Sequence, residues 1–266
     1  MTEITNITEK FNAPTLGGMQ LTPLQQKEMQ QVKRYYEFYE GHNDNDPELK
    51  HEFGQIWKTS EEMAYKPTKE VRNLTKKLIT KQGRFMMGKT PDLILSAVKD
   101  GEEAQKGAED KKAAIEEILT QGRFWSKTSK AFIDCTIGKR VLLMVIANPD
   151  QTLKFRYYTM PEFTYKIDRE DETTLTELQL VYMDEDTENS EDKTKEVWHR
   201  WEYTLDVTNP NATCMCKHYQ TDGNGKTLMT MNAESGEEQE LVEEFDTKLS
   251  KIPGYVIINE GLTGDI

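Results

Sequence analysis

The feature that most constrains the fold is a change of hydrophobic pattern at Arg140. Before this residue, apolar side chains recur at helical spacing, as at Met29, Val32, Tyr36 and Tyr39. After it, short apolar runs are separated by polar or Gly/Asn-rich turns, which is the pattern of β-strands. Helices that precede the strands, instead of alternating with them, favour an α+β fold. We therefore expect N-terminal amphipathic helices followed by an antiparallel β-meander.

Local signals place the expected elements. Thr22, Pro23 and Gln25 form a capping-box pattern that predicts the start of the first helix, and Gly41 its end. Further helices are expected over 48–57, from about 71 to 88, and over 102–121 and 123–137. Residues 91–98 are expected to be extended. Strands are expected over 140–158 (a hairpin with its turn at 148–151), 163–168, 175–183, 196–205, 213–220, 226–231 and, fully buried, 252–261. The acidic stretch 234–246 is expected to be partly helical.

Charge and composition exclude several classes of protein. The chain has 47 acidic and 34 basic residues, a net charge of -13, and phosphate binding instead needs clustered Lys and Arg. Its first 20 residues lack the basic and apolar regions of a secretory signal, and no apolar run approaches the roughly 18 residues of a membrane span. The three cysteines indicate a reducing compartment. Synthesis in the cytoplasm is the simplest interpretation.

One octet matches a nucleotide-binding motif. Residues 83–90, GRFMMGKT, fit the P-loop pattern G-x-x-x-x-G-K-[ST]. A working P-loop follows a buried strand and opens a helix whose N-terminus receives the phosphate. Here the octet follows a predicted helix, Gly88 is placed to cap its C-terminus, and Pro91 favours extended backbone at Thr90. We predict that the octet closes a helix and that no nucleotide cofactor binds. A P-loop NTPase stays open as an alternative.

The same helix carries a basic stripe in an otherwise acidic chain. Val71, Leu74, Leu78, Phe85 and Met86 share one face, and the cationic residues are assigned to the other side. These are Lys69, Arg72, Lys76, Lys77 and Arg84. The stripe is either a solvated face or a surface that meets an acidic neighbour, such as another copy of the chain. On the second interpretation, Arg72, Lys76 and Arg84 are our candidates for the subunit interface.

No catalytic or metal-binding set of residues emerges. Cys214, Cys216 and His218 share one face of a predicted strand, but the spacing is not that of a zinc site, and packed thiols are favoured. The run 184–188, DEDTE, lacks the glycine and the final glutamate of a calcium loop. Trp198 and Trp201 are expected to lie in the core or an interface. The prediction is therefore a non-enzymatic protein with no catalytic, cofactor-binding or metal site.

Four segments, in order, resemble the portal proteins of tailed phages, and most closely those of long-tailed phages of Gram-positive bacteria. Residues 73–93 resemble the helix that ends in a G-F-hydrophobic-hydrophobic-G-K-P-P motif, with Thr90 in place of the first proline. YYEFYEGHND resembles an early helix ending in YY-x-G. Residues 134–168 resemble the family's strand, turn and strand block, and IPGYVIINEGLTGDI the segment that leads into its stem.

This resemblance implies a structural subunit of a ring, usually twelvefold, at one vertex of the virion capsid. Such rings pass double-stranded DNA during packaging and ejection without sequence-specific binding, and they contact capsid, scaffold, terminase and tail-connector proteins but no membrane. It implies a wing-like α+β domain over 21–258 and a lead-in at 259–266 to a stem that this chain lacks. Residues 1–20, which are polar and show no sustained periodicity, are expected to form a flexible arm. The other alternative is a different head–tail adaptor or capsid-associated structural protein.

Overall fold

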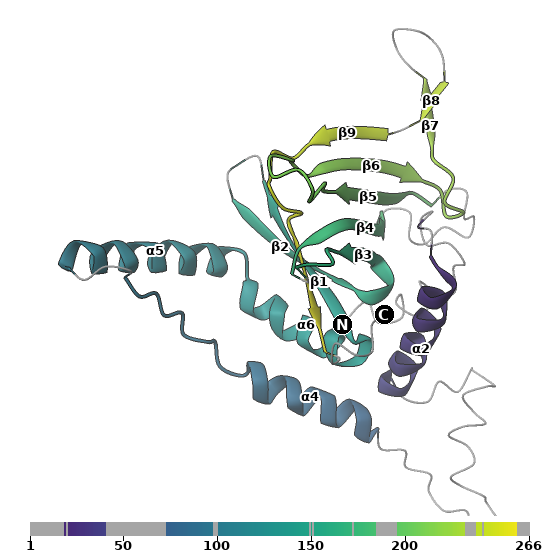
Figure 1. Ribbon diagram of the computed structural model, residues 1–266. Helices are drawn as coiled ribbons and strands as arrows, with labels where there is room; N and C mark the ends of the chain where they lie inside the picture. Colours follow the sequence, from purple (N-terminus) through teal and green to yellow (C-terminus); the bar gives the residue numbers. More distant parts are fainter. Residues whose placement is uncertain are drawn as a thin grey trace, which may run out of the picture.

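The structure is a computed structural model, shown in Figure 1. It describes residues 19, 21–40, 73–97, 101–148, 150, 152–171, 173–184, 196–231, 238–240 and 242–259. The predicted helix over 48–57, the helix end at Gly41, Arg72 and most of the segments 1–20 and 184–196 lie outside these residues.

In the described part of the chain, four α-helices precede the strands. They are α2 (Pro23–Glu40), α4 (Leu74–Met87), α5 (Glu102–Gln121) and α6 (Phe124–Gly138). The predicted capping box begins α2: the Thr22 amide donates to Gln25 Oε1 at 2.9 Å, and the Gln25 amide donates to Thr22 Oγ1 at 3.3 Å. The predicted apolar face of α2 is buried. Residues 91–97 are extended and form no strand.

The strands form antiparallel sheets. The first, in the order β10-β1-β2, contains β10 (Gly254–Ile258), β1 (Arg140–Ala147) and β2 (Leu153–Thr159). A short 3-10 turn, η2 (Met160–Glu162), leads into the second sheet. Its order is β3 (Phe163–Ile167), β4 (Leu175–Met183), β5 (Trp198–Thr204), β6 (Met215–Thr221) and β9 (Val242–Asp246). β7 (Met229–Met231) and β8 (Glu238–Glu240) form a separate pair. The α+β prediction is confirmed.

Two local predictions are wrong. The acidic stretch 234–246 contains strands β8 and β9 and no described helical residue, because β9 pairs with β6 along Tyr219–Val242 to Met215–Asp246. The pairing with β6 satisfies the backbone hydrogen-bonding groups of β9. The local preference of its glutamates had instead favoured a helix. The final strand β10 is not fully buried. It pairs only with β1 and leaves Tyr255, Ile257 and Ile258 exposed at the edge of its sheet.

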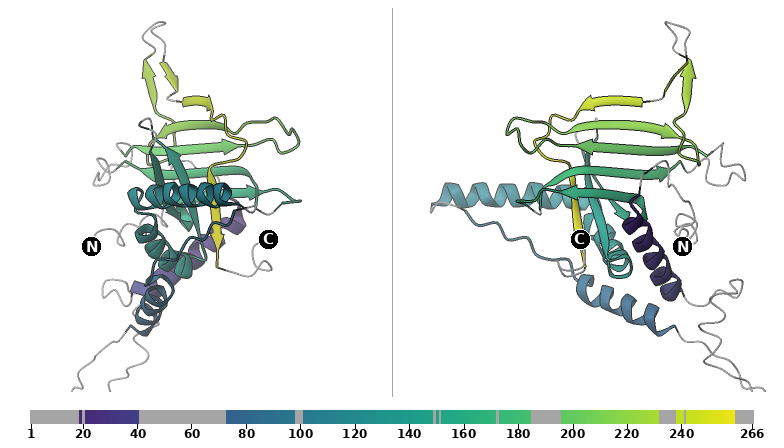
Figure 2. Two further views of the ribbon diagram at one scale, coloured as in Figure 1. Left: turned by 90° about the vertical axis from the view of Figure 1, so that its left-hand side faces the viewer. Right: turned by 45° about the vertical axis from the view of Figure 1, so that its right-hand side comes forward.

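The core is layered. Leu142 and Met144 of β1 face Leu178 and Leu180 of β4, so the two large sheets pack against each other. Val141, which points to the opposite face of β1, contacts α6 through a cluster that includes Cys135. Helix α6 therefore covers the outer face of the three-stranded sheet, and the five-stranded sheet covers its inner face (Figures 1 and 2).

Helix α2 is attached to this body at several points. Val32 and Tyr36 pack against Ile137 of α6 and Met160 of η2. An ion pair between Glu28 and Arg140 joins α2 to the start of β1. Among the described residues, no helix combines the length and the apolar character that crossing a bilayer requires.

Candidate assembly surface

Helix α4 contacts the rest of the structure at two places. At its start, the Asn73 side chain accepts from the Lys76 amide at 2.8 Å and donates to the Tyr39 carbonyl at 2.8 Å, which ties α4 to the end of α2. Further along, Gly83 is the buried residue of the helix and faces Ile133 of α6. A Cβ atom at position 83 would lie 3.0 Å from Ile133 Cγ1, so the absence of a side chain lets the two helices approach closely.

The opposite face of α4 is apolar and exposed to solvent. Leu74, Leu78 and Phe85 are 64%, 67% and 88% exposed. Their spacing, with Lys81 between Leu78 and Phe85, follows one face of the helix, turned about 180° from Gly83 at roughly 100° per residue. Lys77 and Arg84 border this stripe, so they do not lie on the face opposite to it as predicted. We call Leu74, Leu78, Lys81 and Phe85 the α4 stripe.

The octet 83–90 has the geometry of a helix end. Gly83 to Met87 belong to α4, Gly88 is its C-cap as predicted, and residues from Thr90 onward are extended. A helix C-terminus presents carbonyl oxygens, whereas phosphate is held by the amide groups of an N-terminus. The N-terminus of α4 lies at Asn73, ten residues before the octet begins. The polarity is the reverse of a P-loop.

Helix α5 projects away from the sheets (Figure 1). None of its residues is buried. It runs over the predicted bounds 102–121 and ends at Gly122, after which Arg123, in the left-handed region with φ 51°, leads into α6. The Gly122 backbone packs so closely on the Phe155 ring that an added Cβ would lie 2.5 Å from it. The junction with α6 is therefore fixed by packing, while the rest of α5 meets little of the body.

The three predicted interface residues have different surroundings. Arg72 lies outside the described residues. Lys76 Nζ lies 4.0 Å from Glu40 Oε2 and 5.2 Å from the centre of the Tyr39 ring, so it already has partners on α2. Arg84 is exposed beside the α4 stripe. Lys76 and Arg84 thus lie on one helix but do not form a single patch.

The side chains of the candidate thiol site are packed in the protein interior. Cys214 and Cys216 are fully buried, and burial raises the pKa of both thiols above the ordinary value of 9, to about 11 for Cys216. His218 stacks on Trp201, with ring centres 4.0 Å apart. Among the described residues, no group of three or more His, Cys, Asp or Glu side chains could hold a metal ion.

A pair of histidines joins β5 and β6 and was not predicted. His199 Nδ1 lies 2.9 Å from His218 Nε2, so one ring donates to the other. Carboxylates face the outer nitrogens: Asp184 Oδ2 lies 3.9 Å from His199 Nε2, and Glu243 Oε2 lies 3.6 Å from His218 Nδ1. Burial and the neighbouring His199 lower the pKa of His218 below 6.5. The pair is a structural contact between β5 and β6.

The interior also holds a carboxylic acid. The Tyr36 hydroxyl of α2 donates to Asp134 Oδ1 of α6 at 3.4 Å. Burial raises the pKa of Asp134 to about 6, and nearby Glu162 acts in the same direction. This pair contributes to the seam between α2 and α6, and Asp134, which is half-buried, also lines an open cavity of about 340 Å³ beside β2.

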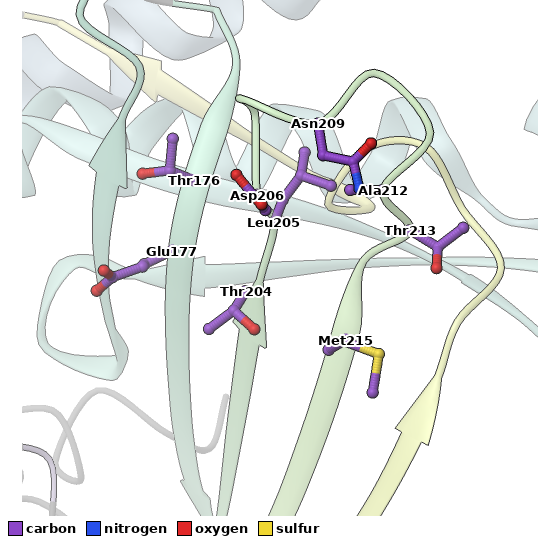
Figure 3. A pocket seen from close by; sticks show the side chains of 9 residues that line it. All are labelled: Thr176, Glu177, Thr204, Leu205, Asp206, Asn209, Ala212, Thr213 and Met215. Atoms are coloured by element: carbon purple, nitrogen blue, oxygen red, sulfur yellow. The ribbon is translucent and has the colours of Figure 1, made fainter.

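An open cavity of about 490 Å³ lies at one end of the five-stranded sheet, between β4, β5, β6 and the loop that joins β5 to β6 (Figure 3). Its carboxylate Asp206 accepts from the amide of Thr208 at 3.0 Å and from its hydroxyl at 2.6 Å. These bonds lower the pKa of Asp206 and hold the loop. The described lining residues include no histidine, cysteine or lysine.

Solvent exposure of the α4 stripe is what sequence reasoning missed. Helical spacing identifies an apolar face but does not say which face meets the body. The signal that could have found it is Gly83, because a glycine in mid-helix marks the side that another backbone approaches.

The chain matches a known protein family. A family model described as "Phage portal protein, SPP1 Gp6-like" matches residues 21–257. None of the curated proteins matches the chain.

Proposed function

The chain belongs to the SPP1 Gp6-like family of phage portal proteins, and from this membership we propose that it is the subunit of a closed ring. The ring would stand at one vertex of the capsid and pass double-stranded DNA during packaging and ejection. The family match over 21–257 is the observation that carries this proposal. The portal role is structural, and the helix-closing geometry of residues 83–90 agrees with it.

Surfaces that a single copy leaves open support the proposed ring. The α4 stripe is exposed and no residue of α5 is buried, and large exposed apolar surface in a polar chain commonly marks a protein contact. Repeating one contact between two different surfaces of identical subunits closes a ring if the rotation fits. A twelvefold ring is the copy number proposed here, with Arg72, Lys76 and Arg84 kept as candidate interface residues.

The further partners proposed are the capsid shell, scaffold, terminase and tail connector. We propose residues 21–258 as the wing of such a portal. DNA would pass as a polymer that the wall does not grip, because a net charge of -13 opposes phosphate binding.

Electron microscopy of the purified chain tests the ring. We expect closed rings with a central hole, and native mass spectrometry should give a single dominant copy number. Particles without a hole at high protein concentration would contradict the portal assignment in favour of another capsid-associated structural protein.

A titration with labelled ATP and magnesium tests the alternative chemistry. We expect no saturable binding to the wild type or to Lys89→Ala. Saturable binding that Lys89→Ala removes would restore the P-loop interpretation.

A further inference from the structure

Helix α5 carries a stripe with the same spacing as that of α4, exposed at Lys111, Ile115 and Ile118. Ala104, Ala108, Lys111, Ile115 and Ile118 recur at alternating intervals of four and three residues, the spacing of a seam between two packed helices. Ile115 and Ile118 are 37% and 36% exposed. The α4 stripe has the same alternation of four, three and four. Each helix therefore presents a narrow apolar seam with a single lysine in it.

The two helices have opposite charge. Helix α4 has four cationic side chains and no carboxylate, whereas α5 has six carboxylates and three lysines. One acidic row on α5 consists of Glu103, Asp110 and Glu117, seven residues apart. At 100° per residue, only Gly107 and Ala114 lie between this row and the α5 stripe.

These small residues leave the acidic row accessible. Nothing lies within 4 Å of a Cβ atom built at Gly107. On α4, Lys77 and Arg84 are also seven apart and border the α4 stripe. If the two stripes face each other, the long side chains of Lys77 and Arg84 can extend across Gly107 and Ala114 to the carboxylates.

We propose that α5 of one copy packs along α4 of the next copy, with the two stripes in contact and Lys77 and Arg84 paired to the acidic row of α5. This inference rests on the proposed ring and names the contact that builds it. The contact joins two different surfaces, which is the arrangement that propagates around a ring. Within one copy, α4 and α5 lie apart in every view of Figures 1 and 2, so the two stripes do not pack against each other within one copy.

A charge exchange tests the pairing. Lys77→Glu with Arg84→Glu should weaken assembly at least about tenfold, measured as the protein concentration at which half the subunits are in rings. Adding Glu103→Lys, Asp110→Lys and Glu117→Lys to the same chain should restore assembly. The matched control is Lys226→Glu with Lys251→Glu. It changes the net charge by the same amount as Lys77→Glu with Arg84→Glu, at two exposed sites elsewhere, and should leave assembly unchanged.

The outcomes separate this inference from the ring itself. Absence of rings in the wild type contradicts the proposed function. Wild-type rings that tolerate Lys77→Glu with Arg84→Glu, or that are not restored by the exchange, overturn the α4–α5 contact and leave the ring standing.

Cross-linking distinguishes contact between copies from contact within one copy. A chain with Leu78→Cys and a second chain with Ala108→Cys are co-expressed and treated with a short bismaleimide; the three native cysteines are buried. We expect mixed 78–108 adducts, which can form only between copies. If adducts instead join position 78 of one copy to position 78 of another, the contact is two-fold. If a 78–108 link forms only when both cysteines are in the same chain, α4 and α5 pack within one copy. Either result overturns the proposal.

Discussion

Gly83 shows how one residue can satisfy a motif and still serve packing. It is the first glycine of the octet, yet it lies inside α4, where its hydrogen allows Ile133 of α6 to approach. Gly83→Leu should destabilise the protein by about 1–3 kcal/mol, because the larger side chain must push α4 away from α6. Thermal or urea unfolding of the variant measures this.

Gly107→Ala is the matched control for that variant. Gly107 lies in mid-helix in α5, where an added Cβ meets nothing within 4 Å. This substitution should stabilise the protein slightly, by about 0.5–1 kcal/mol, since alanine loses less backbone entropy than glycine. Equal effects of the two substitutions would show that Gly83 does not set the distance between α4 and α6.

The charged carboxylate of Asp134 is expected to lower the free energy of unfolding at neutral pH. Its pKa is raised from 3.8 to about 6 by burial, so the folded protein binds this proton more tightly than the unfolded chain. Stability from this group therefore increases as the pH falls from above 6 toward 3.8. Asp134→Asn should stabilise the protein at pH 7.5 by at most about 3 kcal/mol, and the gain should vanish by about pH 4.

The measurement is urea unfolding of both proteins across that pH range. Tyr36 keeps an acceptor in the variant, because the Asn side chain has a carbonyl oxygen. Glu162 and Lys130, which act on the charge of Asp134, are retained in both proteins. A stabilisation that stays constant with pH would mean that the carboxyl is not the cause.

At the level of elements, the sequence best predicts the helices and strands whose bounds depend on neighbouring residues in the chain. The bounds of α5 were predicted because no partner sets them: Gly101 and Gly122 enclose a run of strong helix formers. Strand β9 was missed because its glutamates favour other structure locally, and only the edge of β6 makes it a strand. The exposure of Leu78 and Phe85 was missed for a related reason, since periodicity does not reveal which face another helix covers.

The contact of β5 with β6 should respond to acid through its histidines. In the fold, burial and His199 lower the pKa of His218 below its ordinary 6.5, although Glu243 opposes this. The unfolded chain therefore takes up the proton first, and stability is lost as the pH falls below 6.5. We expect His218→Gln to remove part of this loss between pH 7 and pH 5.

Unfolding of the wild type, His218→Gln and Asp134→Asn at each pH separates the two titrating groups. Asp134 and His218 have opposite slopes in the acidic range, so the single variants are needed to resolve them. The two carboxylates that face the pair, Asp184 and Glu243, are retained in every protein. An unchanged pH profile in His218→Gln would show that the pair is not the sensor.

For the whole molecule, the distribution of charge matters more than its total. The chain carries -13, but α4 has only cationic charged side chains and α5 is mainly acidic. Such a division lets copies attract one another locally while the rest of the surface repels polyanions. In the proposed ring, α4 would be covered, and its lysines would then be withdrawn from DNA.

This division predicts how the chain treats DNA. At 150 mM salt, a 30-base-pair duplex should bind more weakly than about 100 µM, because non-specific binding in the micromolar range needs many more phosphate contacts than α4 alone can make. Fluorescence anisotropy of a labelled duplex measures this. Lys77→Glu with Arg84→Glu should give the same result, since neither cation is expected to meet DNA. If the wild type binds the duplex tightly, with an affinity that falls steeply with salt and is lost in this variant, α4 is a DNA-binding surface. That result would contradict the proposal that α4 lies between two subunits.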